Sequence, residues 1–486
     1  MQRYIMESNI ALRGWLNRPY TYLRHEHGNP HDLSKAEFLF LLDCDGTHEA
    51  NNAVLAESLV KKGLIRASGP GETLSKWQEY RFYPHIYYRE IMFEITEKCN
   101  YNCRHCFNAE STGTPRAELS VDEISSLSRQ AAAQGISGAD LTGGEPMRHP
   151  HFMEVVRVIT DAGLKIRMIN TNGAYITDEI LEEFTKAGIR PSFRISFDGM
   201  GFHEWMRGVK GAQEQTLKAI SLCIKKHFPV LIQTNLNKRN LSVMRQTIDE
   251  MDAAGVEEMR IIRTTEAPRW VQQAGNDCLS WEEYFDEALA LLSYYESKPR
   301  SMRLVFWQFV NAEQKTKRFQ VMKIQFQSAD AAANRLPCQE KLSIGADGQI
   351  YPCLQMSGAL KEHGVRLADT KKEALSALLS DSPYMRVAAK SGLELKDGNE
   401  RCRNCPFAIY CAGGCPAISL ITHGKYDAQD NSSCVFFRDG YYRKIKEILR
   451  DYKDVRPMPD SIDPSYLKQF DYRIDKFLDI DPGDFL

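Results

Sequence analysis

Short runs of apolar residues alternate with amphipathic stretches between residues 88 and 265. These runs predict β-strands at residues 90–96, 138–142, 164–170, 192–197, 229–236 and 258–263. Three of the stretches between them end in an Ala-Gly pair shortly before the next strand, which is a common way to end a helix. Regular β–α alternation predicts parallel strands joined by right-handed crossovers. Six units are fewer than the eight of a closed barrel. We therefore expect an α/β fold with an open, partial (β/α)6 barrel over residues 88–310, and chemistry at the C-terminal ends of its strands.

The first 85 residues have a different pattern and predict a separate module. Alternation in residues 9–25 predicts a β-ribbon, and Ser34 with Glu37 makes a capping box that opens a helix. A second helix over roughly residues 48–62 and a returning strand complete a predicted winged helix-turn-helix. Such a module can bind DNA, but its second helix offers few phosphate-binding side chains. We favour a module that binds a peptide as an added strand at the exposed ribbon edge.

The second half of the chain divides by composition. Residues 270 to 337 are predicted to be largely helical, and we assign residues 311–337 to a bridge. A cysteine-rich domain is expected over residues 338–455, followed by an acidic C-terminal tail over residues 456–486.

Composition narrows the classes of function. The 62 Lys and Arg nearly balance the 64 Asp and Glu, so no large electric field favours nucleic acid or an anionic membrane as partner. No apolar stretch approaches the ~18–20 residues of a transmembrane helix, and the N-terminal residues lack the apolar core of a signal peptide. We expect a cytoplasmic protein with reduced thiols, in which most of the 13 cysteines bind metal. Cys44, Cys223 and Cys278 stand apart and are expected to be small buried hydrophobic residues.

A C-x3-C-x2-C motif directly follows the first predicted barrel strand, with cysteines at Cys99, Cys103 and Cys106. Structural zinc sites of this size usually have four protein ligands in paired C-x2-C knuckles. Three thiolates on one short loop instead suit a [4Fe–4S] cluster with one iron open to a small molecule.

With this motif the sequence strongly resembles the radical S-adenosylmethionine (SAM) enzymes. In that family the open iron binds SAM, and an electron from the cluster cleaves SAM to a 5′-deoxyadenosyl radical that takes hydrogen from a substrate. The motifs GGEP, NTNG, SFDG and EWMRG follow the family pattern at successive strand ends. The resemblance implies SAM contacts from His105, Phe107, Gly143, Gly144, Glu145, Asn172, Ser196, Asp198, Arg207 and Asn235.

Seven further cysteines lie between residues 338 and 434, with Gly348 before the second of them. A pair of zinc ribbons is the alternative, but seven thiolates divide badly into closed sites of four ligands. The spacing closely resembles the SPASM extension of radical SAM enzymes, which carries two auxiliary [4Fe–4S] clusters, so three clusters are expected in all. That resemblance assigns Cys402, Cys405, Cys411 and Cys434 to auxiliary cluster II. It assigns Cys338, Cys353 and Cys415 to auxiliary cluster I, whose remaining ligand is water, a non-cysteine side chain or, as we favour, a substrate thiolate.

The N-terminal module resembles the PqqD-like recognition element of enzymes that modify ribosomally synthesised peptides. The resemblance implies a sactipeptide- or ranthipeptide-type maturase that binds a precursor peptide through its leader and receives electrons from a donor such as flavodoxin or ferredoxin. We expect Cys thioether cross-links. Carbon–carbon cross-links and epimerised residues are the alternatives.

Other classes stay open. Anaerobic sulfatase-maturating enzymes, which form formylglycine, carry an Asp where this chain has Leu354. A small-molecule redox enzyme and a DNA-binding Fe–S sensor are further alternatives. No catalytic base is identifiable: Glu94, Arg263 and Glu266 could face the substrate, but ordinary barrel salt bridges are expected for them.

Overall fold

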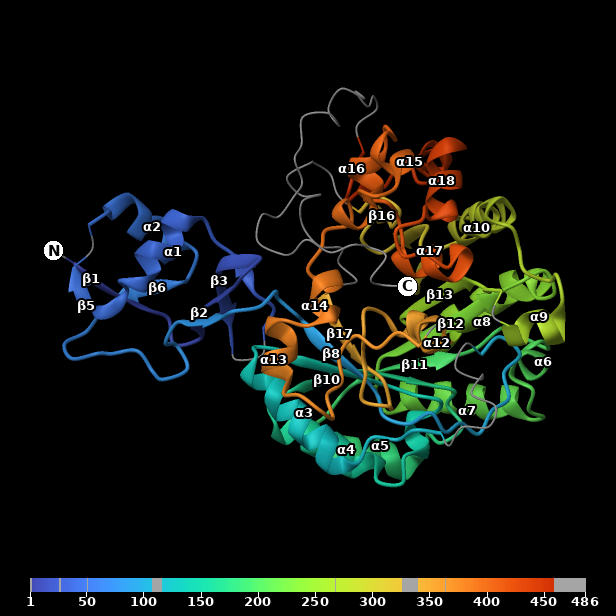
Figure 1. Cartoon of the computed structure of the whole chain (residues 1–486), viewed down its shortest axis with the longest axis horizontal. Helices are drawn as coiled ribbons and strands as arrows, with labels where there is room; N and C mark the ends of the chain where they lie inside the picture. The colour runs from blue at the N-terminus through green and yellow to red at the C-terminus, as the bar shows by residue number, and fades with distance from the viewer. Residues whose placement is uncertain are drawn as a thin grey trace.

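A computed structural model describes residues 2–25, 28–49, 51–106, 116–266, 268–325, 340–362 and 364–458. Figure 1 shows a small N-terminal module at one side of a larger body, in which an α/β barrel domain carries a C-terminal domain. Phe107, Cys338 and most of the predicted acidic tail lie outside the described residues. Within those residues, no helix combines the length and apolar character needed to cross a membrane.

The N-terminal module contains two small sheets and two helices. Its elements are β1 (Arg3–Met6), β2 (Ile10–Trp15), β3 (Arg18–Arg24), β4 (His31–Asp32), α1 (Lys35–Leu42), β5 (Asp45–Glu49), α2 (Ala53–Lys61), β6 (Ile65–Ala67) and β7 (Arg81–Tyr83). The β2–β3 pair is the predicted ribbon, and the capping box of Ser34 and Glu37 opens α1 as predicted. The predicted start of the second helix is wrong. Residues 48 and 49 belong to strand β5. The helix begins after Asn52, whose side chain accepts the Leu55 N–H and so caps the helix N-terminus. The winged helix-turn-helix assignment stays a prediction.

Eight parallel strands form the centre of the barrel sheet. The six predicted strands are confirmed as β8 (Glu90–Glu94), β9 (Gly138–Thr142), β10 (Lys165–Thr171), β11 (Ser192–Ser196), β12 (Val230–Leu236) and β13 (Glu258–Arg263). The other two parallel strands are β14 (Arg303–Phe306), beside β13, and β17 (Lys341–Ile344), beside β8. The predicted number of six parallel strands is therefore too low by two, because strands of four residues are too short for a clear periodic signal. The full sheet has the order β18-β17-β8-β9-β10-β11-β12-β13-β14-β15-β16-β19.

The predicted helical bridge is partly wrong. Residues 268–296 do contain α9 (Pro268–Ala274) and α10 (Trp281–Glu296). Residues 303–321 instead form β14, β15 (Val310–Glu313) and β16 (Arg318–Val321). Strands β15 and β16 extend the sheet as two antiparallel strands after β14. These strands are four residues each, too short for their alternation to stand out in the sequence.

Helices cover the outer face of the sheet, as Figure 1 shows for α3, α4, α5 and α7. The barrel helices are α3 (Val121–Ala133), α4 (Phe152–Asp161), α5 (Asp178–Lys186), α6 (His203–Arg207), α7 (Ala212–Lys225) and α8 (Met244–Ala254). Each strand turns alternate residues toward these helices. In β13, Met259 and Ile261 are fully buried in the main core, while Arg260 and Ile262, which alternate with them, are partly exposed on the inner face. This alternation leaves the inner face of the sheet available for polar groups.

The C-terminal domain consists of short helices around β18 (Ile350–Tyr351). They are α12 (Ser357–Glu362), α13 (Leu375–Ser380), α14 (Pro383–Ala388), α15 (Glu400–Arg403), α16 (Ala408–Cys411), α17 (Pro416–His423), α18 (Asn431–Arg438) and α19 (Tyr441–Ile448). The rings of Phe436 and Tyr441 pack on Phe285 of α10, and β19 (Lys453–Asp454) pairs with β16. The cysteine-rich part of the chain is therefore fixed to the barrel through apolar contacts and a shared sheet. Its assignment as a SPASM domain stays a prediction.

Candidate functional site

The three-cysteine loop begins five residues after β8 and is held by helix α6. Cys99, Cys103 and Cys106 are all half-buried. The Asn102 and Arg104 amides donate to the Arg207 and Met206 carbonyls at 3.2 and 2.9 Å. Burial raises the pKa of the Cys99 thiol, so a bound metal would be needed to hold it as a thiolate at neutral pH.

A buried ion pair links the loop to strand β11. The Arg207 Nε donates to Asp198 Oδ2 at 2.7 Å, and its Nη1 lies 3.7 Å from Cys103 Sγ. The guanidinium holds the pKa of the fully buried Asp198 carboxyl well below its usual range, against the effect of burial. The Arg207 Nη2 group is buried and has no hydrogen-bond partner among the described residues. It is a donor available to an anionic group beside the cysteines, as a SAM carboxylate would require.

The GGEP loop packs directly on the backbone that leads into the cysteine loop. The Gly144 and Glu145 amides donate to the Thr96 and Lys98 carbonyls at 2.7 and 2.9 Å. A Cβ at Gly144 would lie 2.5 Å from the Lys98 carbonyl oxygen, and one at Gly143 would overlap that of Thr96. Both positions therefore need glycine because two backbones approach closely.

Glu145 faces the protein interior and ties two strand ends together. Its carboxylate accepts from Thr171 Oγ1 and from the Asn172 amide, both at 2.8 Å, and from the Met147 amide at 3.2 Å. Burial raises the pKa of Glu145 to about 7. The carboxylate thus positions the β9 and β10 ends.

Asparagines at two strand ends contact the cysteine loop. Asn172 Nδ2 donates to Asn100 Oδ1 at 2.9 Å, and Asn235 Nδ2 lies 3.1 Å from His105 Nε2. Burial, with a contribution from the Arg207 charge, lowers the pKa of His105 to about 3, so the imidazole is neutral. Its Nδ1 has no partner within the part of the chain that is described.

The predicted SAM residues therefore gather at one end of the sheet, apart from Phe107, which is outside the described residues. Ser196 ends β11, next to Gln233 of β12. Of the candidates for the substrate face, Arg263 and Glu266 form the expected salt bridge. Glu94 is buried and accepts from the Ala346 amide at 3.3 Å.

Three site residues were missed from the sequence. The Asp198 amide donates to His203 Nδ1 at 3.1 Å, and His203 Nε2 lies 3.2 Å from Thr216 Oγ1. Thr216 in turn donates to the Asn172 carbonyl, and Asn240 donates to the Asp198 carbonyl. One signal was available: His203 is four residues before Arg207, on the same face of a helix.

The cysteines predicted for auxiliary cluster II lie around one cavity. Cys402 of α15, Cys405, Cys411 of α16 and Cys434 of α18 line a cavity of about 270 Å³. Burial raises the pKa of the Cys402 thiol to about 11 and that of the Cys411 thiol further. Four thiols around one cavity, whose lining also includes Asp430, are a donor set that fits an iron–sulfur cluster.

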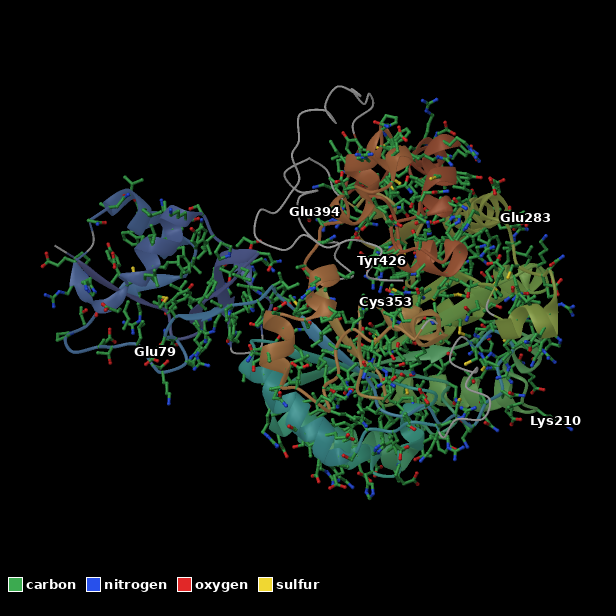
Figure 2. The ribbon with its side chains drawn as sticks, viewed as in Figure 1. Glu79, Lys210, Glu283, Cys353, Glu394 and Tyr426 are labelled. Atoms are coloured by element: carbon green, nitrogen blue, oxygen red, sulfur yellow. The ribbon has the colours of Figure 1, made fainter. Side chains whose placement is uncertain are left out.

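Two of the cysteines predicted for auxiliary cluster I are described. Burial raises the pKa of Cys353 to about 11, and the nearby Cys415 thiolate adds to this effect. Cys353 lies near the centre of the view in Figure 2, where the C-terminal domain meets the barrel. Among the described residues, no three His, Cys, Asp or Glu side chains form a site for a single metal ion. Each thiolate that holds an iron–sulfur cluster binds a different iron. Cysteines that are too far apart to share a single metal ion can therefore still hold a cluster.

Comparisons with known proteins agree with this geometry. Residues 93–253 match the model of the Radical SAM superfamily. The chain is 38% identical over 163 residues to the AdoMet-dependent heme synthase of Methanosarcina barkeri, covering 33% of this chain and 46% of that protein. It is 27% identical over 177 residues to the sporulation killing factor maturation protein SkfB of Bacillus subtilis, covering 36% of this chain and 42% of that one. The matched region thus spans less than half of each of these two relatives.

The fold is similar to that of Streptococcus suis SuiB. The crystal structure of SuiB bound to its precursor peptide SuiA matches with a TM-score of 0.61 and 14% identity, covering 89% of this chain and 100% of that chain. At this identity the likeness establishes the fold and nothing more.

The buried ion pair predicts a coupled effect on stability. Arg207→Met is expected to lower the free energy of unfolding by about 3–5 kcal/mol, because it leaves the Asp198 carboxylate buried and unpaired. Adding Asp198→Asn should recover much of that loss, since the buried charge is then removed as well. Denaturant unfolding under anaerobic conditions measures both variants. Additive losses from the two substitutions would contradict direct pairing.

A pH dependence follows from Glu94. Burial raises its pKa to about 7, above the ~4.3 of an exposed glutamate. Protonation thus stabilises the folded state at low pH, and this contribution is lost as the pH rises through 7. Relative to wild type, Glu94→Gln should gain thermal stability from about pH 5 to about pH 8, as measured by the midpoint of thermal unfolding at each pH. Parallel curves for Glu94→Gln and wild type would refute the assignment.

Proposed function

We propose that this chain, whose residues 93–253 form a radical SAM domain, is an enzyme that cross-links a ribosomally synthesised precursor peptide, with Cys thioethers as the product. Two likenesses support a peptide substrate: SkfB is a maturation protein, and SuiB binds a precursor peptide. The observation that carries the SAM-dependent part of the proposal is the spare Arg207 N–H group beside the three-cysteine loop.

The residues at the strand ends fit an iron–sulfur cluster with bound SAM. Cys99, Cys103 and Cys106 would hold the cluster, and Arg207 would hold the SAM carboxylate while Asp198 keeps the guanidinium in place. When bound, this pair supplies a 5′-deoxyadenosyl radical that takes a hydrogen atom from a substrate carbon. The chain's own residues orient the cofactor: the GGEP backbone fixes the cysteine loop, and the neutral His105 with Asn235 borders the site.

The cysteine-rich domain would supply two auxiliary [4Fe–4S] clusters. Cys402, Cys405, Cys411 and Cys434 would fill one of them, as their shared cavity suggests. Cys353 and Cys415, with Cys338, would hold the other and leave one iron for the substrate thiolate. In thioether formation the substrate carbon would lose a hydrogen atom to the 5′-deoxyadenosyl radical and the thiol would lose a proton. Formation of the C–S bond then leaves one electron that must be removed from the site. An auxiliary cluster is the expected acceptor, and an external ferredoxin or flavodoxin would supply the electrons that start each turnover.

The N-terminal module would bind the leader of the precursor peptide. The β-ribbon and the sheet order β4-β3-β2-β7 end in the short strands β4 and β7. Strand β7 is largely exposed, with Phe82 47% accessible. An exposed strand edge beside an aromatic side chain suits an added peptide strand.

A second candidate is a radical SAM enzyme that oxidises a small molecule. The 38% identity with a heme synthase over 163 residues favours it. Substrate turnover decides between the two candidates, since the small-molecule enzyme would leave a precursor peptide unchanged.

The test is an anaerobic reaction of reconstituted protein, reductant and SAM with a cysteine-containing precursor peptide encoded beside the enzyme. We expect each modification to remove two hydrogens and to protect one cysteine from alkylation, as read by high-resolution mass spectrometry. Cys353→Ala should abolish this change, whereas Cys278→Ala, at a half-buried thiol outside both cysteine groups, should keep it. Loss of two hydrogens with all thiols still free would mean that the product is a carbon–carbon cross-link and not a thioether. An unmodified peptide would contradict the proposal.

A further inference from the structure

Lys396 is a buried lysine in the cysteine-rich domain whose ammonium has neutral hydrogen-bond partners. The residue is 2% exposed. Its Nζ donates to Ser419 Oγ at 2.7 Å, to the Tyr426 carbonyl at 2.9 Å and to the Ala428 carbonyl. A lysine ammonium has three N–H donors, and these three oxygens use all of them without supplying a negative charge.

The charge of Lys396 is not balanced by a carboxylate in direct contact. Among the described residues, no Asp or Glu oxygen forms a salt bridge with its Nζ. Asp430 lies in the same buried layer, but it accepts from the Lys323 ammonium at 3.3 Å and from the Cys415 amide at 2.9 Å. The charges of Lys323 and Asp430 neutralise each other. The positive charge of Lys396 is then left unbalanced among these three buried residues. A buried ammonium without a nearby anion costs several kcal/mol.

Lys396 is near cysteines that are predicted to hold two different clusters. Lys396 lines a small cavity with Cys402, and its partner Ser419 donates to the Cys415 carbonyl at 3.1 Å. Burial lowers the pKa of Lys396, while the Cys402 thiolate, ahead of Asp430 and Cys415, raises it.

The CAGGC loop that carries Cys411 and Cys415 is fitted around this charge layer. Gly413 has a φ of +71°, and a Cβ there would overlap the Lys396 side chain. Gly414 has a φ of +77°, and a Cβ there would lie 2.5 Å from the Asp430 Cβ. The backbone between the two cysteines thus lies against Lys396 on one side and Asp430 on the other.

We propose that Lys396 is a positioning residue whose fixed positive charge serves both auxiliary clusters and makes them easier to reduce. This inference rests on the proposed function, because it requires those clusters. An iron–sulfur cluster bound by thiolates is anionic, and its reduction potential follows the net charge and polar groups around it. A cation favours the reduced, more negative form. Lys396 therefore helps the auxiliary clusters to accept the electron that leaves the substrate when the cross-link forms.

The alternative is a purely structural role, in which Lys396 only links the segments of Ser419, Tyr426 and Ala428 by hydrogen bonds. It predicts a loss of stability on substitution without a change in redox behaviour, and it predicts that glutamine, which keeps N–H donors, largely substitutes for lysine. The charge proposal predicts instead that glutamine behaves as a loss of function and that arginine, which keeps the charge, restores it.

The test is an anaerobic potentiometric titration of the full-length, reconstituted protein, followed by electron paramagnetic resonance. We expect Lys396→Gln to lower the midpoint potentials of the auxiliary clusters and leave that of the cluster at Cys99, Cys103 and Cys106 unchanged. Lys396→Arg should stay near wild type. Lys425→Gln, at an exposed lysine next to Tyr426, whose carbonyl accepts from Lys396, is the matched control and should match wild type.

Each outcome decides the question. If Lys396→Gln keeps the auxiliary clusters at lowered midpoint potentials while Lys396→Arg stays near wild type, the charge sets those potentials and the proposal stands. If both variants keep their clusters at wild-type potentials, or if arginine fails as glutamine does, the role of Lys396 is packing and the proposal is overturned. Iron content separates this from failure of the proposed function: about four irons per wild-type chain, in place of about twelve, would mean that the auxiliary clusters do not exist.

Discussion

The buried contact between Asp198 and Arg207 is the interaction on which the candidate site depends. It joins the end of β11 to the helix α6, and through the Arg207 carbonyl and guanidinium it reaches the cysteine loop. A buried ion pair is costly to form and still more costly to break, so it is weak as a source of stability but strong as a constraint on geometry. Here the ion pair fixes the orientation of the Arg207 guanidinium and leaves its Nη2 group without a hydrogen-bond partner among the described residues. The loop, the strand ends and the neutral imidazole of His105 are arranged around that constraint.

A second charge arrangement organises the cysteine-rich domain. Thiols in this domain are so buried that their pKa values are raised, which means that the cysteines alone are poor anions. Two buried lysines and one buried aspartate lie among them. Such a layer is unfavourable in an empty apolar core, and it becomes favourable when thiolates and iron–sulfur clusters supply the missing negative charge. The candidate site in the barrel and the cysteine-rich domain thus share one arrangement, a buried cation beside cysteines.

Much of the fold could be predicted because its signals are local. The six strands from β8 to β13 and the capping box of Ser34 depend on short-range periodicity and on neighbouring side chains. The gathering of Asn172, Asp198 and Asn235 followed from topology, since parallel strands end at one edge. The short strands of residues 303–321 carried too few residues for a periodic signal, and a strand replaced the predicted start of α2.

Other features required the three-dimensional structure. The inward role of Glu145 was not predictable, because its partners Thr171 and Asn172 come from another strand. Lys396 belongs to no motif and acquires its role through contacts distant in sequence. The leader-binding role of the N-terminal module, the SPASM assignment and the cytoplasmic location stay predictions.

The most direct measurement is the yield of 5′-deoxyadenosine from SAM under anaerobic, reducing conditions, compared between wild type and Arg207→Met, both loaded with iron to the same extent. If the spare guanidinium group holds the SAM carboxylate, wild type forms 5′-deoxyadenosine and the variant requires far more SAM to reach the same rate. Equal rates at every SAM concentration would contradict the account, because Arg207 would then have no part in binding the cofactor.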